Sequence, residues 1–138
     1  MARDFNSATA AATVSTAFLS GSAGPFTVSC YFRPSGVYPW NISLNRNILR
    51  AEPSGQWRVR WRASANTVDF AATGYTGTDP GTNSGLTLVE SQGATGAWIG
   101  YRYAGAGGEW AKFLDGVKTV INASITFAFG ASSSFAVG

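Results

Sequence analysis

Apolar and polar residues alternate along most of the chain with a period of two. Successive side chains of a β-strand point to opposite faces, so this period predicts strands that bury one face. In 25–34, for example, Phe26, Val28, Cys30 and Phe32 share one side between two prolines. Further strands are expected in 40–52, 56–63, 67–72, 85–92, 97–105, 109–121 and the last two segments, ITFAFG and SFAVG.

Helical periodicity is almost absent, and we expect no stable surface helix. The alanine-rich stretch 6–19 lacks charges and contains several threonines, so it is interpreted as a loop and a strand. Asp115-Gly116 predicts a hairpin within 109–121, because a type I′ turn needs positive φ at both central residues. Glycine-rich stretches at 73–85 and 105–108 indicate loops. The pattern predicts one all-β domain over residues 1–138, a two-sheet antiparallel sandwich or barrel.

In the segment QWRVRWRA, residues 56–63, positively charged residues alternate strictly with apolar ones. As a strand it places Arg58, Arg60 and Arg62 on one face, spaced by about 7 Å. The opposite face then carries Trp57, Val59 and Trp61, which we assign to the core together with Trp98 and Trp110. The arginine row can face solvent, internal acids such as Asp69 or Glu90, or a negatively charged partner. We expect partner binding through Arg58, Arg60 and Arg62, because like charges at this spacing repel one another.

Charge and composition restrict the class of partner. Only 12% of the 138 residues are charged, and the net charge of +3 reflects few acids more than many bases. Ten lysines and arginines are too few for a nucleic-acid-binding surface, so no nucleic-acid partner is expected. The N-terminal residues lack the apolar run of a signal peptide, and no stretch is long enough to span a membrane. The single cysteine excludes an intrachain disulfide.

Enzymatic activity is not expected. The chain has no histidine, which removes histidine acid–base chemistry and the Ser-His-Asp triad. Glycoside hydrolysis needs two carboxylates close together, yet Glu52, Glu90 and Glu109 have no acid two residues later. Cys30 alternates with apolar residues and is interpreted as a small core side chain.

Two kinds of ligand site remain open. Asp79 and Asn83, with loop carbonyls, form a weak candidate calcium site, although Asp-Pro-Gly is favoured as a simple turn; otherwise no cofactor is expected. Aromatic residues near loops can stack on sugar rings, with Tyr75, Tyr38 and Trp40 as the leading candidates. Tyr101 and Tyr103 are weaker candidates of the same kind.

Two segments carry a family resemblance. PFTVSCYFRP resembles the FTvsaWvkP strand of the concanavalin A-like, laminin-G-type jelly-roll superfamily, and GAWIGYRYAGAGGEWAKFLDGV resembles its W-h-vA…y-vDG stretch. Trp98 would then match the family tryptophan, and 113–116 its hairpin. The resemblance covers about residues 3–138 and implies a jelly-roll sandwich of two antiparallel sheets. It also implies carbohydrate binding or glucan cleavage as activities of relatives.

The chain departs from that family in two ways. The usual last strands, which follow the segment resembling SFAVG and return beside the N-terminal strand, are expected to be missing after Gly138. Either the sandwich is C-terminally abbreviated or a sheet edge near residues 3–6 is left open. An open edge favours self-association. In addition, Asp4, Asp69, Asp79 and Asp115 are too widely separated in sequence to indicate the calcium loops found in relatives.

The opening MAR-x-FN resembles short stand-alone chains among bacteriophage structural proteins. We therefore expect a non-enzymatic virion protein, decorating a capsid or lying on a tail surface, assembled in the cytoplasm and not secreted through a signal peptide. Its expected partners are other virion proteins and further copies of itself. The alternatives are a carbohydrate-binding adhesion module and, remotely, a glycan-cleaving enzyme.

Overall fold

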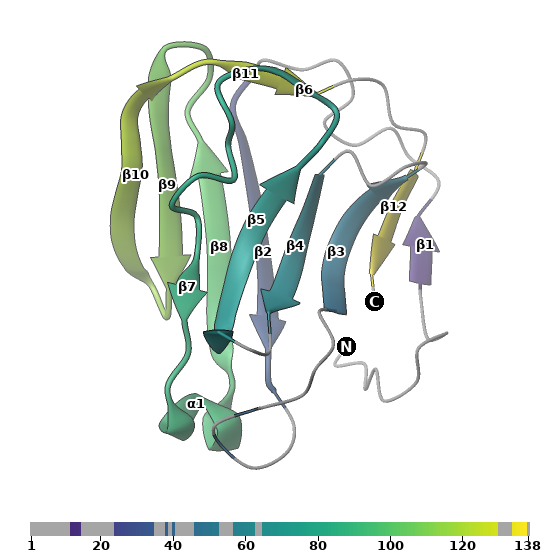
Figure 1. Cartoon of the computed structure of the whole chain (residues 1–138), viewed down its shortest axis with the longest axis vertical. Coiled ribbons are helices and arrows are strands. Elements are labelled where there is room, and N and C mark those ends of the chain that lie inside the picture. Colours follow the sequence, from purple (N-terminus) through teal and green to yellow (C-terminus); the bar gives the residue numbers. More distant parts are fainter. Residues whose placement is uncertain are drawn as a thin grey trace.

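The computed structural model describes residues 12–14, 24–34, 38, 40, 46–52, 57–62, 65–129 and 134–137 (Figure 1). Most of these residues lie in antiparallel strands, as the sequence predicts. The larger sheet, sheet A, has the order β1 (Ala12–Val14), β12 (Ser134–Val137), β3 (Arg46–Glu52), β4 (Trp57–Arg62), β5 (Thr67–Ala72) and β7 (Leu86–Thr87). Sheet B has the order β10 (Val117–Ile125), β9 (Gly108–Leu114), β8 (Ala97–Tyr103) and β2 (Phe26–Phe32).

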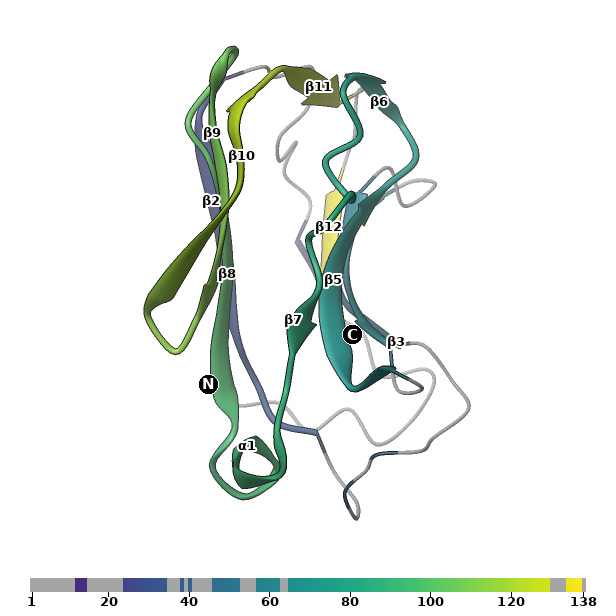
Figure 2. The same cartoon turned by 60° about the vertical axis from the view of Figure 1, so that its left-hand side comes forward.

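A third pair of strands lies at one end of the two sheets. Strand β11 (Phe127–Phe129) pairs with β6 (Tyr75–Gly77), which lies inside the stretch predicted as a loop. The short helix α1 (Glu90–Thr95) lies at the opposite end (Figures 1 and 2). In the view of Figure 2, sheet B and sheet A form two facing layers, with β7 at the near side of the space between them. This is the arrangement of an all-β sandwich.

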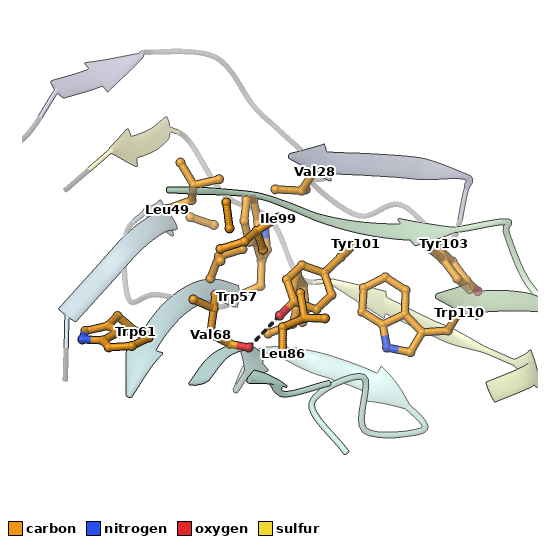
Figure 3. Packing of buried hydrophobic residues seen from close by; sticks show 14 of the residues in the cluster. Val28, Leu49, Trp57, Trp61, Val68, Leu86, Ile99, Tyr101, Tyr103 and Trp110 are labelled. Carbon is orange, nitrogen blue, oxygen red and sulfur yellow. Dashed lines mark hydrogen bonds between the residues drawn. The ribbon is translucent and has the colours of Figure 1, made fainter. Parts of the chain in front are cut away.

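The core lies between the two sheets and is built from the inward faces that alternation predicts (Figure 3). Strand β4 contributes Trp57, Val59 and Trp61, all buried. From the facing layer come Ile99, Tyr101 and Tyr103 of β8, Trp110 of β9 and Val28 of β2. Burial of this aromatic and aliphatic surface is the main force that holds the layers together.

The hairpin predicted at Asp115-Gly116 is confirmed. Both residues have positive φ, 50° and 83°, and Val117 pairs with Leu114 across the turn. The Asp115 carboxylate accepts hydrogen bonds from the Trp98 backbone N–H and from the Gln92 side-chain amide, each at 2.8 Å. One turn residue therefore connects the hairpin to β8 and to α1.

The strand predicted over 85–92 is wrong beyond Thr87. Leu86 and Leu88 are buried, but Val89 is 52% exposed, and the chain enters α1 at Glu90. The Gln92 side chain accepts a hydrogen bond from the Val89 N–H at 2.9 Å, which satisfies a backbone donor at the helix start. The alternation of apolar residues ends at this point, so a strand here would have no buried face.

Trp98 is also placed differently from its prediction. It alternates with Ile99, Tyr101 and Tyr103 along β8, and these three side chains fill the inner face of sheet B. Trp98 consequently lies on the outer face and is 59% exposed. The assignment of Trp98 to the core is therefore wrong, whereas that of Trp57, Trp61 and Trp110 is confirmed.

The strand predicted in the last segment, SFAVG, is confirmed as β12. Strand β12 pairs with β1 on one side and with β3 on the other, in antiparallel register. The predicted abbreviation of the sandwich concerns strands after this segment, and it stays a prediction. Residues 3–6, where the open edge was placed, lie outside the described residues.

Burial of Cys30 leads to a testable prediction. Its side chain packs against the core from β2, and desolvation raises the pKa of the thiol to about 11, from 9.0. Two pKa units correspond to about a hundredfold less thiolate at pH 8, and the thiolate is the reactive form. We expect alkylation by iodoacetamide to be slower than in denaturant by at least about that factor. Equal rates in the folded and unfolded chain, followed by mass spectrometry, would contradict this placement.

Candidate functional site

The arginine row lies on the outer face of sheet A. Strand β4 is central there, between β3 and β5, and its burial pattern alternates between buried core residues and more exposed arginines. Register places Arg58 between Arg50 of β3 and Ala71 of β5, and Arg60 between Asn47 and Asp69. We call the set Arg50, Arg58, Arg60 and Arg62 the arginine face. Three of its four residues come from the pattern recognised in the sequence.

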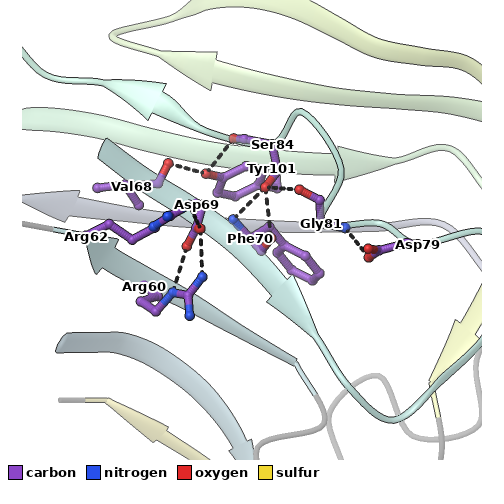
Figure 4. Close-up of polar contacts among 9 residues, drawn as sticks. All are labelled: Arg60, Arg62, Val68, Asp69, Phe70, Asp79, Gly81, Ser84 and Tyr101. Atoms are coloured by element: carbon purple, nitrogen blue, oxygen red, sulfur yellow. Dashed lines mark hydrogen bonds and ion pairs between the residues drawn. The ribbon is translucent and has the colours of Figure 1, made fainter. Parts of the chain in front are cut away.

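One acid pairs with two of these arginines (Figure 4). Asp69 of β5 accepts two hydrogen bonds from Arg60, Nε to Oδ1 at 3.0 Å and Nη2 to Oδ2 at 2.8 Å. Arg62 Nη1 lies 3.5 Å from the same Oδ2. The hydrogen bond to Asp69 raises the pKa of Arg60, although partial burial opposes the shift. A bidentate guanidinium–carboxylate pair fixes both side chains. Internal pairing, one of the three alternatives, is thus what the structure shows for Arg60 and Arg62.

Arg58 differs from its two neighbours. It lies directly opposite Arg50 across the β3–β4 ladder, and within the described part of the chain no acid forms an ion pair with it. Its Nε is buried without a hydrogen bond. Like charges in opposing positions of a ladder destabilise a sheet, and a buried donor without an acceptor adds a cost. Glu90, the second internal acid considered, begins α1 and lies away from this face at the end of the sandwich (Figure 1).

The candidate calcium residues have other partners. Asp79 Oδ1 accepts a hydrogen bond from the Gly81 N–H at 2.8 Å, which is the turn geometry favoured from the sequence. The Lys112 ammonium donates to the carbonyls of Asn83 and Gly85, at 2.9 and 2.7 Å. Partial burial lowers the pKa of Lys112. A positive amine therefore binds the carbonyls that a calcium ion would need, and the described residues include no group of three or more acids, cysteines or histidines suited to a metal ion.

Buried polar groups hold the same loop in place. Ser84 Oγ accepts from the Phe70 N–H at 3.0 Å, and it lies 2.8 Å from the carbonyls of Phe70 and Gly81 (Figure 4). The Tyr101 hydroxyl lies 3.1 Å from the carbonyls of Val68 and Ser84, and Trp110 Nε1 donates to Pro80 O at 2.8 Å. The loop thus satisfies core donors, which is a structural role.

The aromatic residues considered for sugar stacking do not form one site. Trp40 is buried against Trp61, 2% exposed, so its ring offers no face to a ligand. Tyr38 packs edge-on against Trp40 and is half-exposed. Tyr75 lies in β6, at one end of the sandwich, whereas Trp40 lies against Gly93 of α1 at the other end (Figure 1). Tyr101 and Tyr103 are fully buried. The stacking role assigned to Trp40, Tyr101 and Tyr103 is therefore wrong.

An exposed aromatic site that the sequence interpretation missed lies on the outer face of sheet B. Trp98 packs edge-on against Tyr31 of β2, with ring centroids 5.5 Å apart, and both rings are about half-exposed. Next to Trp98 is a shallow hollow of about 250 Å³ with Gly100 in its lining. The sequence signal for this site is the alternation along β8. It places Trp98 and Gly100 on one face of the sheet and Ile99 and Tyr101 on the other face.

Comparisons with protein-family models, with curated proteins and with solved structures found no significant match for this chain. In the part of the chain that the structure describes, no helix is both long and apolar enough to cross a membrane.

Proposed function

We propose that this protein is a non-enzymatic virion structural and interaction protein that uses its arginine face to bind an acidic surface of a neighbouring virion protein. The observation that carries the proposal concerns Arg58, which is half-buried and lies opposite Arg50. Arg58 itself has no ion-pair partner among the described side chains. A carboxylate from a partner would give this guanidinium a charge-assisted hydrogen bond and offset the repulsion from Arg50.

The geometry of the face supports protein binding over solvent exposure alone. Asp69 already holds Arg60 and Arg62 in fixed positions, so a partner has less side-chain entropy to remove when it binds. The central strands of a sheet are also its least flexible part, which suits a surface that must keep its shape in an assembly. The capsid decoration or tail-surface role itself comes from the resemblance of the opening MAR-x-FN to phage structural proteins.

The finer assignment of the fold is part of the same proposal. We infer a concanavalin A-like jelly roll, since two antiparallel sheets enclose one aromatic core and the hairpin at Asp115-Gly116 follows the family-like tryptophan of β8. Localisation on the virion surface after cytoplasmic assembly follows from the proposed role, and so does association with further copies of the chain.

The first test asks whether the chain is a virion component. Phage particles purified by density gradient from the culture that carries the gene are analysed by quantitative mass spectrometry. We expect the protein in a fixed ratio to the major capsid or tail protein. Its absence from purified particles would overturn the virion role.

The second test concerns the arginine face and uses Arg58→Glu. A glutamate here lies opposite Arg50, so the fold is expected to persist while the charge offered to a partner is reversed. Binding of the purified variant to particles depleted of the protein should weaken at least about tenfold, and wild-type binding should weaken as salt is raised. Arg33→Glu, an equal charge change directly after β2, is the control and should bind normally. If the Arg58 variant bound as well as the wild type, the arginine face would be a solvent-exposed surface and not a partner-binding one.

A further inference from the structure

The outer strands of the two large sheets differ in how well they could accept a strand from another chain. An outer strand has backbone N–H and C=O groups on one side that can pair with a further strand, and short length, charge or bulges discourage this. In sheet A, the outer strands β1 and β7 are described as three and two residues long. In sheet B, the ladder between β10 and β9 shifts register twice, and Lys118 adds a charge. The remaining outer strand of the described sheets is β2.

Strand β2 is a long, regular and uncharged edge. Its seven residues, FTVSCYF, pair one by one with β8, from Phe26 opposite Tyr103 to Phe32 opposite Ala97, without a register shift. They include no charged residue, proline or glycine, and most are aromatic or β-branched. This composition is typical of segments that pair between chains. Within the described part of the chain, no strand pairs with the other side of β2.

The inner side chains of β2 are only partly covered by the rest of the sandwich. Val28 is buried, but Phe26, Cys30 and Phe32 on the same face are intermediate in exposure, although they pack against the core. A strand added at this edge would cover more of the two phenylalanine rings, and burial of apolar surface is favourable. The edge therefore offers apolar contacts as well as backbone hydrogen bonds.

We propose that two copies of this chain pair through β2, antiparallel about a two-fold axis, so that their four-stranded sheets join into one. A second β2 suits this edge, because its inner residues are equally apolar and it brings no charge that would repel its copy. Each copy offers one such edge among its described strands, so the assembly closes at two copies. This pairing gives a surface to the self-association proposed above and does not depend on the virion role.

The two prolines that bound β2 determine the register. Both cores lie on the same side of the joint sheet when inner residues face inner residues, so the register changes in steps of two. With Ser29 on the axis, Phe26 lies opposite Phe32 of the second copy, and Pro25 and Pro34 lie outside the ladder. A shift by two in either direction places one of these prolines opposite a strand residue, where it has no N–H to donate. The register centred on Ser29 is therefore favoured.

The nearest charge of sheet B does not oppose this pairing. Arg102 lies opposite Thr27 on the outer face and forms an ion pair with Glu109 at 2.7 Å. In the register centred on Ser29, Tyr31 of the second copy lies on the other side of Thr27. The two copies of Arg102 are then in different rows of the joint sheet, so like charges do not face each other.

The first test measures the mass of the purified full chain by sedimentation over a range of concentrations. We expect a monomer–dimer equilibrium that Ser29→Lys weakens at least about tenfold, because two lysines then lie opposite each other on the axis. Ser29 is exposed, so this variant should keep the fold. Thr87→Lys, the same charge added to the outer strand β7 of sheet A, is the control and should associate normally. A chain that stays monomeric up to millimolar concentration, or undiminished association of Ser29→Lys, would overturn the proposal.

The second test cross-links the two strands and identifies the register. In a Cys30→Ala background, whose fold is checked by circular dichroism, Ser29→Cys places two thiols in opposite positions, and we expect a disulfide-linked dimer after mild oxidation. Thr27→Cys in the same background is the control, because its two copies would lie about 14 Å apart, too far for a disulfide. A dimer that cross-links through Thr27→Cys and not through Ser29→Cys would contradict this pairing. It would indicate another strand or partner at the edge. Both tests use the purified chain alone, so their failure is distinct from failure of the virion role.

Discussion

Replacing Trp110 by alanine is expected to lower the free energy of unfolding by about 4 kcal/mol. The side chain is fully buried and contacts aromatic rings from several elements: Phe70 of β5 at 5.2 Å, Phe127 of β11 at 5.5 Å and Tyr101 of β8 at 5.8 Å between centroids. Its indole N–H also donates to the Pro80 carbonyl at 2.8 Å. Alanine would leave a cavity between the two sheets and an unpaired carbonyl in the loop.

The matched control is Trp98→Ala. The same residue type is removed from the adjacent strand, but Trp98 is 59% exposed, and its one aromatic neighbour among the described residues is Tyr31. We expect a loss of about 1 kcal/mol or less. Both variants are compared with the wild type by urea unfolding, where a lower midpoint with an unchanged slope reports stability.

A third variant covers the case in which Trp110→Ala does not fold. Trp110→Phe keeps a ring in the core but loses the hydrogen bond to Pro80, and a loss of about 2 kcal/mol is expected. If Trp98→Ala were as destabilising as either Trp110 variant, the placement of Trp98 on the outer face would be contradicted.

The contrast between these two tryptophans illustrates what sequence reasoning achieves here. Alternation determines which residues of a strand share a face. It placed Trp98 and Gly100 on one face of the strand, and Ile99 and Tyr101 on the other. It does not say which face is the core. The outer face of β8 carries one large apolar residue, Trp98, beside Gly100 and Arg102, and its hydrophobicity alone favoured burial. Only the pairing of β8 with β2 and β9, and the position of sheet A, decide that Ile99, Tyr101 and Tyr103 point inward.

The arginine face was predictable in outline but not in its pairing. The period of two identified Arg58, Arg60 and Arg62 as one row. Which acid meets which arginine depends on register, because a shift by one residue moves a side chain to the other face. The observed register places Asp69 beside Arg60 and leaves Arg58 opposite Arg50, a residue that local pattern alone did not connect with the row.

The remaining errors have a common cause in long-range packing. Helix α1 begins where alternation ends, and Gly93 within it lies against the ring of Trp40, a contact between residues far apart in sequence. Strand β6, in the stretch predicted as a loop, is three residues long and pairs with β11 from the last part of the chain. Short elements stabilised by distant partners carry little local signal, so their existence depends on tertiary context.

Replacing Gly77 by alanine should be the most damaging of the glycine-to-alanine changes at exposed positions, with an expected loss of about 3 kcal/mol. Gly77 ends β6 and has a φ of 92°, which an L-alanine adopts at a cost of about 1 kcal/mol. A Cβ at this position would also overlap the Thr126 carbonyl oxygen, and it would lie 3.2 Å from Thr126 C and 3.3 Å from the Cα of Phe127. These are backbone atoms, which cannot turn away as a side chain can.

Gly116→Ala separates the conformational cost of a positive φ from the cost of the overlap with backbone atoms. Gly116 has a similar φ of 83°, but a Cβ there would have no atom within 4 Å, so only the conformational cost of about 1 kcal/mol is expected. The difference between the two variants in urea unfolding therefore measures how closely β6 approaches the backbone before β11. Since Thr126 O also accepts the Thr78 N–H at 2.9 Å, forcing these segments apart would break that bond as well. If Gly77→Ala lost no more stability than Gly116→Ala, the pairing of β6 with β11 would be looser than described.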